Sequence, residues 1–232
     1  MNNELSSKND SQYWSSFWKE RWQKNETGFH QEEINKNLTS WWRKLKIQPG
    51  TQVFVPLCGK SNDMLWLLQQ GHKVLGIELS NKAVEEFFIE NQLEPEVTEK
   101  HTKNGSFMSY RLSDITILCG DIFSLTSTDL KEVSAVYDRA SLIALPPELR
   151  KQYSDHLKEV LPLDAQTLLV TLEYPQQEMS GPPFSVSDQE IKDLYGSKYQ
   201  IEKLNEQEIL QENDRFKQRG LTSLKETVYR LY

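Results

Sequence analysis

Residues 53–80, VFVPLCGKSNDMLWLLQQGHKVLGIELS, contain the pattern that decides the fold. The apolar residues 53–55 are typical of a buried strand. Apolar residues then recur at helical spacing, between a predicted cap at Ser61 and a left-handed terminator at Gly71. A second buried strand, residues 73–77, follows directly. This order of strand, helix and strand predicts a parallel sheet covered by helices.

The same alternation continues through the rest of the chain. Ser80 opens another helix, and turn residues separate the apolar runs that come after it. Further strands are predicted near residues 106–111, 115–118, 135–137, 167–172, 199–204 and 221–232, and further helices near 12–24, 34–45, 148–160 and 188–195. Because the C-terminal part is poor in helices, its strands are expected to pair as an antiparallel hairpin. We therefore predict an α/β fold with a doubly wound, mostly parallel seven-stranded sheet and an antiparallel edge hairpin.

Composition limits the class of partner. The 232 residues suit one domain, expected over 13–232, and the polar residues 1–12 are expected to form a disordered tail. A net charge of −7 disfavours binding to nucleic acid or anionic membranes, so a small-molecule partner is expected. Two cysteines and the lack of a signal-like or membrane-spanning apolar run favour a soluble, cytoplasmic protein. No exposed heptad pattern is evident, which favours a monomer.

The turn after the first strand resembles a nucleotide-binding loop only in part. Gly59-Lys60-Ser61 matches the end of the phosphate-loop motif, but the position that requires glycine, five residues earlier, is Phe54. Cysteine phosphatase chemistry is disfavoured as well, since the residue six positions after Cys58 is Met64 and not arginine. We interpret Cys58 as a turn residue.

Three predicted strands end in residues suited to ligand binding. In doubly wound sheets, ligands lie beyond the carboxyl ends of the strands. Glu78 ends the second strand 19 positions after Gly59, where a carboxylate accepts hydrogen bonds from an adenosine ribose. NAD and S-adenosylmethionine both carry that ribose, but a lone glycine suits a methionine moiety better than a pyrophosphate. Asp121 is positioned to accept from the adenine amino group, and Ile122 or Phe123 to pack on the ring.

Five stretches of the chain resemble the thiopurine S-methyltransferase family. They are VFVPLCGKSNDMLWL (53–67), GHKVLGIELS (71–80), FFIENQ (87–92), YDRASLIALPPELR (137–150) and TGFHQ (27–31). The resemblance runs in order from about Tyr13 to Tyr232. The related halide and thiol methyltransferases rank second, because they usually differ at residues 28–30 and 58–60. Ser141 departs from the small residue that usually follows Arg139-Ala140.

The resemblance implies a Rossmann-like methyltransferase fold that binds S-adenosylmethionine and releases S-adenosylhomocysteine. The residues that it places in the cofactor site are Trp18, Trp22, Leu57, Glu78, Asp121, Ile122 and Arg139. It implies that a thiol acceptor contacts Phe29, Arg139 and Arg215, with Arg139 as the catalytic candidate. The aromatic N-terminal helix and the TGFHQ loop are expected to form a lid that excludes water.

The expected reaction is an in-line displacement at the sulfonium methyl by the acceptor sulfur, in which the arginines stabilise a thiolate or the purine nitrogens. Structural alternatives are core packing for the two tryptophans, an ion pair of Arg139 with Asp138 or Glu148, and a surface position for Arg215. Metalloid acceptors containing selenium or tellurium, and a non-catalytic S-adenosylmethionine sensor, remain open. No metal site is expected, since His30 has no second ligand at metal-binding spacing.

Overall fold

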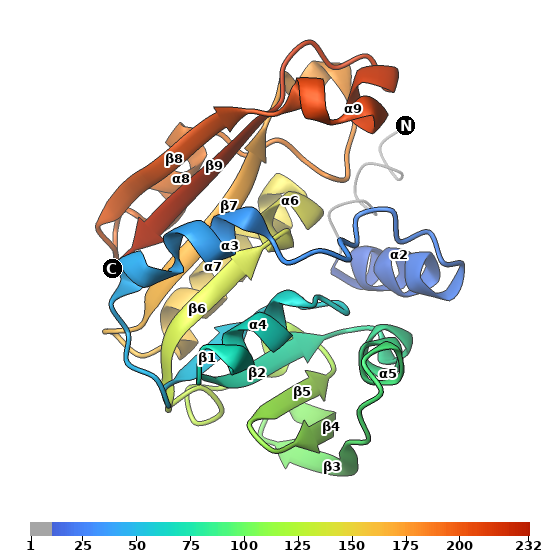
Figure 1. Ribbon diagram of the computed structural model, residues 1–232, viewed down its shortest axis with the longest axis vertical. Helices are drawn as coiled ribbons and strands as arrows, with labels where there is room; N and C mark the ends of the chain where they lie inside the picture. Colours follow the sequence, from blue (N-terminus) through green and yellow to red (C-terminus); the bar gives the residue numbers. More distant parts are fainter. Residues whose placement is uncertain (1–10) are drawn as a thin grey trace.

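A single sheet organises the chain in the computed structural model, which describes residues 11–232. The strand order is β3-β4-β5-β2-β1-β6-β7-β9-β8 (Figure 1). The strands are β1 (Gln52–Val55), β2 (Lys73–Glu78), β3 (Glu96–Thr102), β4 (Gly105–Leu112), β5 (Ile115–Cys119), β6 (Val133–Arg139), β7 (Gln166–Glu173), β8 (Ile201–Glu208) and β9 (Lys225–Leu231). The five central strands, from β5 to β7 in this order, are parallel. Strands β3, β4, β8 and β9 pair antiparallel at the two edges.

Helices cover both faces of the sheet. One face carries α3 (Lys36–Trp41), the 3-10 helix η1 (Trp42–Leu45), α4 (Asp63–Gln69) and α5 (Asn81–Glu90), which share one apolar cluster with the strands. The other face carries α6 (Ser141–Ala144), α7 (Pro147–Val160) and α8 (Asp188–Tyr195). The remaining elements are α2 (Ser11–Gln23), η2 (Ile122–Ser124), η3 (Gln176–Glu178), η4 (Leu210–Glu212) and α9 (Asp214–Gln218). This arrangement confirms the predicted doubly wound α/β fold.

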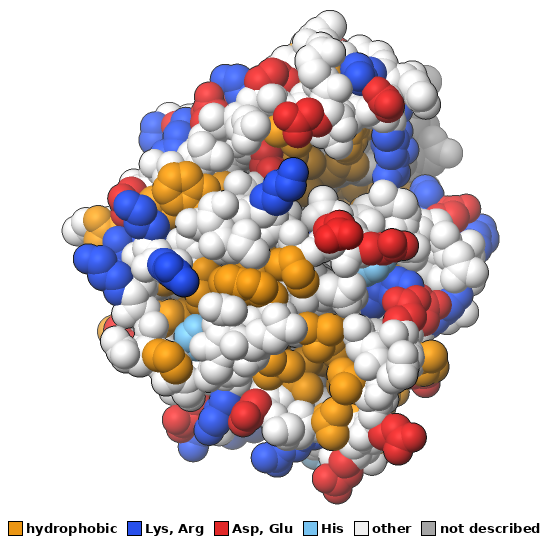
Figure 2. Space-filling view, viewed as in Figure 1, with side chains coloured by type: hydrophobic (Ala, Val, Ile, Leu, Met, Phe, Trp, Pro, Cys, Tyr) orange, Lys and Arg blue, Asp and Glu red, His pale blue; other side chains and the backbone are white. Residues whose placement is uncertain are grey.

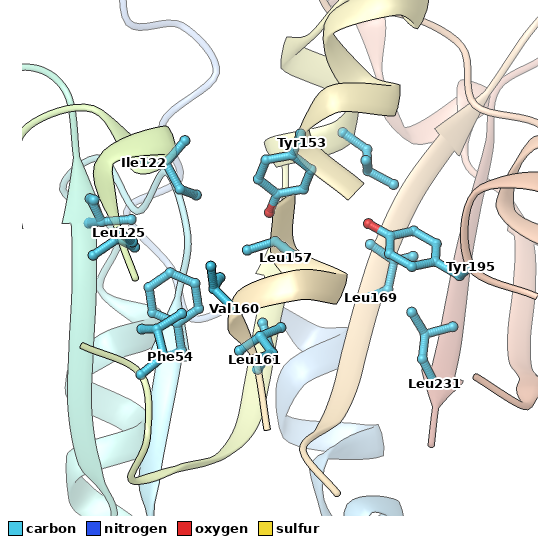
Figure 3. Close-up of a cluster of buried hydrophobic side chains, with 14 of the residues drawn as sticks. Phe54, Ile122, Leu125, Tyr153, Leu157, Val160, Leu161, Leu169, Tyr195 and Leu231 are labelled. Atoms are coloured by element: carbon cyan, nitrogen blue, oxygen red, sulfur yellow. The ribbon is translucent and has the colours of Figure 1, made fainter. Parts of the chain in front are cut away.

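The core beneath α7 shows how the apolar pattern produces this packing. Tyr153 and Leu157 lie one turn apart on α7 and face the sheet, where Phe54 of β1 and Leu169 of β7 are fully buried (Figure 3). Burying each side chain of this size contributes about 1.5–3 kcal/mol to the stability of the fold. The sheet and α7 are therefore held as one rigid support for the loops at the strand ends.

The sheet has nine strands rather than the predicted seven. The strand without a predicted counterpart is β3, which extends the β5 edge by pairing with β4, the strand predicted near residues 106–111. Strand β3 has no buried face, because none of its residues is buried and most are exposed. Its sequence, EVTEKHT, therefore lacks the alternation that identifies a strand.

Three local predictions need correction. The helix predicted over 34–45 is divided into α3 and η1. Helix α4 begins at Asp63 with Asn62 as its N-cap residue, while Ser61 Oγ accepts a 3.3 Å hydrogen bond from the Asp63 N–H. Of the tail predicted over 1–12, residues 1–10 lie outside the described residues, and Ser11 and Gln12 belong to α2.

The carboxyl ends of the parallel strands meet at one edge of the molecule. Helix α2 lies beyond these ends, apart from the two helical layers, and α9 lies near the start of β9 (Figure 1). Gly71 has a φ of +83°, which confirms the predicted left-handed terminator and lets β2 start two residues later. The fold thus brings the loops after β1, β2, β5 and β6 together under α2.

Candidate active site

Two adjoining cavities open at this edge of the sheet. The small cavity, of about 130 Å³, is lined by residues of α2 and of the loops after β1, β2 and β5. The large cavity, of about 670 Å³, lies between the Phe29 loop, the end of β6, residues 178–183 and α9. Figure 2 shows a recessed apolar surface below the α9 end of the molecule with lysine or arginine side chains beside it. Trp18, Phe29 and Ala140 line both cavities, so the two spaces meet at these side chains.

The structure divides the sequence-predicted residues between these cavities. Those that line the small cavity are Trp18, Trp22, Leu57, Glu78, Asp121 and Ile122. Phe29, Arg139 and Arg215 line the large cavity. Arg139 does not line the small cavity, although it was predicted for the cofactor; it also lines a third space, of about 50 Å³, next to Gly59.

Glu78 is the buried anchor of the small cavity. Its Oε2 accepts a 2.9 Å hydrogen bond from the Gly59 N–H, and its Oε1 accepts one of 2.8 Å from the Ser80 N–H. Burial raises the pKa of Glu78, while these backbone donors oppose the shift. A carboxylate offers about four acceptor sites, so acceptor capacity remains for the hydroxyls of a ligand.

The loop after β1 has a tightly constrained backbone. Leu57 and Gly59 both have left-handed φ values, of 45° and 52°. A Cβ atom at Gly59 would lie 3.1 Å from the Trp22 ring, so α2 closes directly over this turn. Cys58 is buried below it, and burial raises the pKa of its thiol. The sequence interpretation of Cys58 as a turn residue rather than a nucleophile is therefore supported.

The loop after β5 forms the opposite wall. Asp121 accepts a 3.0 Å hydrogen bond from the Phe123 N–H and so caps η2. Ile122 is buried beside it. Tyr153 of α7 also lines the small cavity, and sequence reasoning missed it because helical spacing alone assigns it to the core.

The aromatic side chains of α2 enclose both cavities. The Trp18 and Trp22 rings meet Phe29 edge to face, at centroid distances of 5.4 and 5.5 Å. Trp22 is almost fully buried, as the core-packing alternative requires. Trp18 is different, because its Nε1 is buried without a hydrogen-bond partner at the wall between the cavities. A buried indole N–H usually has an acceptor, and a ligand atom would supply one here.

Arg139 is fixed by a carboxylate that the sequence did not identify. Its Nε donates to Asp63 Oδ2 at 3.0 Å, and Asp63 is buried at the start of α4. The Tyr137 hydroxyl donates to the same oxygen, and the Asn35 N–H donates to Oδ1. The structural alternative for Arg139 named Asp138 or Glu148 as its ion-pair partner, but the partner is Asp63.

Arg215 joins α9 to the loop that contains Phe29. Its Nη1 donates to the Gly28 carbonyl oxygen, and a Cβ at Gly28 would lie 2.9 Å from the same nitrogen. Burial lowers the pKa of Arg215. Arg215 is exposed, as the surface alternative states, and it also lines the large cavity together with Arg139.

Sequence reasoning also missed Glu226, a carboxylate of the large cavity. Glu226 lies on β9, and its Oε2 accepts a 2.6 Å hydrogen bond from Asn37 Nδ2. The available signal was the spacing to Val228. The two residues are two positions apart, so a strand places both side chains on one face. Across residues 11–232, no cluster of three or more His, Cys, Asp or Glu side chains could hold a metal ion. No helix of that same part is long and apolar enough to cross a membrane.

Comparison with known proteins identifies the family to which this chain is similar. The family model described as thiopurine S-methyltransferase matches residues 14–232. A thiopurine S-methyltransferase of Nitrosospira multiformis is 50% identical over 93% of this chain and 96% of its own. One of Pseudomonas fluorescens is 49% identical over 93% of this chain and 97% of its own.

Solved structures share the fold at low sequence identity. An S-adenosylmethionine-dependent methyltransferase from Anabaena variabilis superposes with a TM-score of 0.61 at 14% identity, over 94% of this chain and 93% of its own. The magnesium protoporphyrin IX methyltransferase of Synechocystis, solved with S-adenosylmethionine bound, superposes with a TM-score of 0.58 at 18% identity. The match covers 93% of this chain and 96% of its own. The match along the chain and the fold agree with the resemblance of the sequence motifs. This chain belongs to the thiopurine S-methyltransferase family.

Proposed function

We propose that the protein transfers the methyl group of S-adenosylmethionine to the sulfur of aromatic or heterocyclic thiols such as thiopurines. The family consists of S-adenosylmethionine-dependent methyltransferases. The observation that carries the choice of a small aromatic acceptor is the pair of cavities that meet at Trp18, Phe29 and Ala140. The small cavity carries the acceptor carboxylates of Glu78 and Asp121, which match the donors of an adenosine, and the larger one has aromatic, aliphatic and guanidinium groups in its wall.

In the proposed cofactor site, Glu78 accepts hydrogen bonds from the ribose hydroxyls, and Asp121 accepts from the adenine amino group. Ile122 packs against the adenine ring. Leu57 and Gly59 hold the turn that approaches the methionine part, and Trp22 covers it. The orphan N–H of Trp18 gains an acceptor when the cavity is filled. The residues present therefore fit S-adenosylmethionine.

S-adenosylmethionine supplies an electrophilic methyl group at its sulfonium. The protein holds the acceptor sulfur in line with that group, and such alignment supplies several kcal/mol of the barrier reduction. Phe29 packs on the acceptor ring, while Arg139 and Arg215 stabilise negative charge on its sulfur or nitrogens. Helix α2 and the Phe29 loop exclude water, which strengthens these electrostatic interactions.

Arg139 is suited to this role because its guanidinium is already oriented. Its Nε donates to Asp63, and its Nη2 makes a long contact of 3.5 Å with Ser61 Oγ, while the residue lines the large cavity. An oriented donor costs no reorganisation during the reaction. We therefore propose Arg139 as the catalytic residue that touches the acceptor.

The test is transfer of a CD₃-labelled methyl group from S-adenosylmethionine to 6-mercaptopurine, with the product and its methyl position identified by mass spectrometry and NMR. We expect the S-methyl product. Methylation of selenium or tellurium oxyanions, or of halide, in place of thiols would contradict the proposed acceptor class. Cofactor binding without transfer to any of them would indicate a sensor. We further propose that the protein acts as a cytoplasmic monomer.

A further inference from the structure

Glu226 places a carboxylate in the wall of the large cavity, on the same face of the sheet as Arg139. Arg139 of β6 pairs with Val170 of β7, and Val170 pairs with Val228 of β9. Side chains two residues apart on a strand share a face, so Glu226 lies on this face with Val228. Glu226 and Arg139 both line the large cavity.

The other carboxylates in this wall are already engaged. Glu26 forms an ion pair with Arg21 at 2.7 Å. Glu178 accepts two bonds of 2.8 Å, from the Thr222 N–H and hydroxyl. Glu226 is bonded to a neutral amide, that of Asn37. Among the cavity carboxylates of residues 11–232, Glu226 is therefore the one whose charge has no bonded cation or backbone donor.

The surroundings of Glu226 favour proton uptake. Burial raises its pKa, and the charge of Glu212 at the end of η4 raises it further. The Asn37 amide of α3 and the Arg139 guanidinium of β6 act in the opposite direction. A carboxyl group whose pKa lies above its ordinary value holds a proton better near neutral pH, as a general base must.

Starting from the proposed function, we propose that Glu226 accepts the ring N–H of a heterocyclic thione and takes its proton as the neighbouring sulfur is methylated. Many heterocyclic thiols exist as cyclic thioamides, H–N–C=S, rather than as thiols. When such a sulfur attacks, the S–CH₃ bond forms, and the bond between the methyl group and the sulfonium sulfur breaks. The sulfonium sulfur keeps that electron pair and leaves as a neutral thioether.

The proton balance of this step requires a base. As C=S becomes C–S, the ring C–N bond becomes C=N, and the N–H proton moves to the Glu226 carboxylate. The positive charge on the sulfonium and the negative charge on Glu226 are both lost, so the net charge of the site does not change in this step. Arginines cannot accept this proton, because their pKa is too high. Simple arenethiols with electron-withdrawing groups need no such base, since they ionise in water before binding.

The inference therefore names a substrate class, cyclic thioamides with an N–H beside the sulfur. The experiment compares 6-mercaptopurine, which carries this group, with 4-nitrothiophenol, which is ionised at neutral pH and has no ring N–H. We expect Glu226→Gln to lower kcat/KM for 6-mercaptopurine by about 10²-fold or more, the usual contribution of a general base. For 4-nitrothiophenol, kcat/KM is expected to stay at the wild-type value.

Two controls separate this role from a structural one. Glu202 of β8 pairs with Arg230 at the surface, and Glu202→Gln is expected to leave both reactions unchanged. Asn37→Ala removes a donor that lowers the pKa of Glu226, so the acidic limb of the pH profile for 6-mercaptopurine is expected to move to higher pH. Binding of S-adenosylhomocysteine, measured by calorimetry, checks that each variant is folded.

Equal losses for both acceptors in Glu226→Gln, or no loss for either, would overturn the assignment of Glu226. An unshifted acidic limb in Asn37→Ala would also count against it. A wild-type enzyme that methylates neither acceptor would overturn the proposed function itself, together with this inference, and that result is read before any variant is compared.

Discussion

The backbone N–H of Gly59 donates to Glu78 Oε2 across 2.9 Å, so the carboxylate that ends β2 also fixes the turn after β1. Gly59 follows β1 and Glu78 ends β2, two neighbouring parallel strands whose carboxyl ends lie side by side. One buried side chain thereby shapes the turn and presents its remaining acceptor sites to the small cavity. The fold and the proposed cofactor site depend on the same contact.

Glu78→Ala is expected to weaken binding of S-adenosylhomocysteine by about 1.5–3 kcal/mol, the scale of a hydrogen bond to a charged group. The turn at Gly59 also loses its acceptor in this variant. Calorimetric titration measures the change, and an unaltered Kd would remove Glu78 from the cofactor site. Glu85→Ala, on the exposed face of α5, is the matched control.

Arg139→Ala is expected to lower kcat for methyl transfer by about 10²-fold, as loss of an oriented charge-stabilising donor does. Affinity for S-adenosylhomocysteine should fall much less. Because Asp63 then keeps a buried carboxylate without its cation, the melting temperature should fall as well. Arg139→Lys, which retains the charge beside Asp63, separates folding from catalysis. Equal losses of transfer and cofactor binding would argue for a purely structural arginine.

Arg215→Ala is expected to raise KM for the thiol at least about tenfold, because a hydrogen bond to a charged group contributes about 1.5–3 kcal/mol. Binding of S-adenosylhomocysteine should be unaffected, since Arg215 does not line the small cavity. Lys217→Ala is a control on the same helix, where Lys217 pairs with Asp214 at the surface. Steady-state kinetics with varied thiol provide the comparison. A KM equal to that of the control would place Arg215 outside the acceptor site.

Asp138 is expected to make stability depend on pH. Burial raises its pKa from 3.8 to about 6, against the opposing bond from Tyr153. Because the folded-state pKa is the higher one, the native state binds the proton more tightly, and this contribution to stability is lost as pH rises through 6. The shift of about two units corresponds to about 3 kcal/mol.

Asp138→Asn does not titrate, so its free energy of unfolding relative to wild type should increase by up to about 3 kcal/mol between pH 4 and pH 7. Urea denaturation at several pH values measures this difference. A difference that stays constant with pH would show that folding does not raise the pKa of Asp138.

The fold and much of the site could be predicted because both depend on local signals. The apolar runs at 53–55 and 73–77 show where the parallel strands lie, and the residues directly after them fall at the carboxyl edge of the sheet by geometry. Glu78 and Asp121 were found in this way. The match to family motifs then supplied Phe29, together with Trp18 and Trp22, whose helical spacing alone indicates core packing.

The parts of the site that could not be predicted depend on contacts between distant parts of the chain. Asp63 and Arg139 are 76 positions apart, and no spacing rule pairs them. Glu226 meets Asn37 across 189 positions, through the packing of α3 on β9. Strand β3 was missed for a different reason, since an exposed edge strand has no buried face to impose alternation.

The most direct test of the two-cavity account is a crystal structure with S-adenosylhomocysteine and 6-mercaptopurine bound together. We expect the cofactor product in the small cavity with its ribose on Glu78, and the purine in the large cavity beside Phe29 and Arg139. The purine sulfur should point at the cofactor sulfur through the junction at Trp18 and Ala140, with room for one methyl group between them. A purine bound elsewhere, or with its sulfur turned away from the small cavity, would contradict the account.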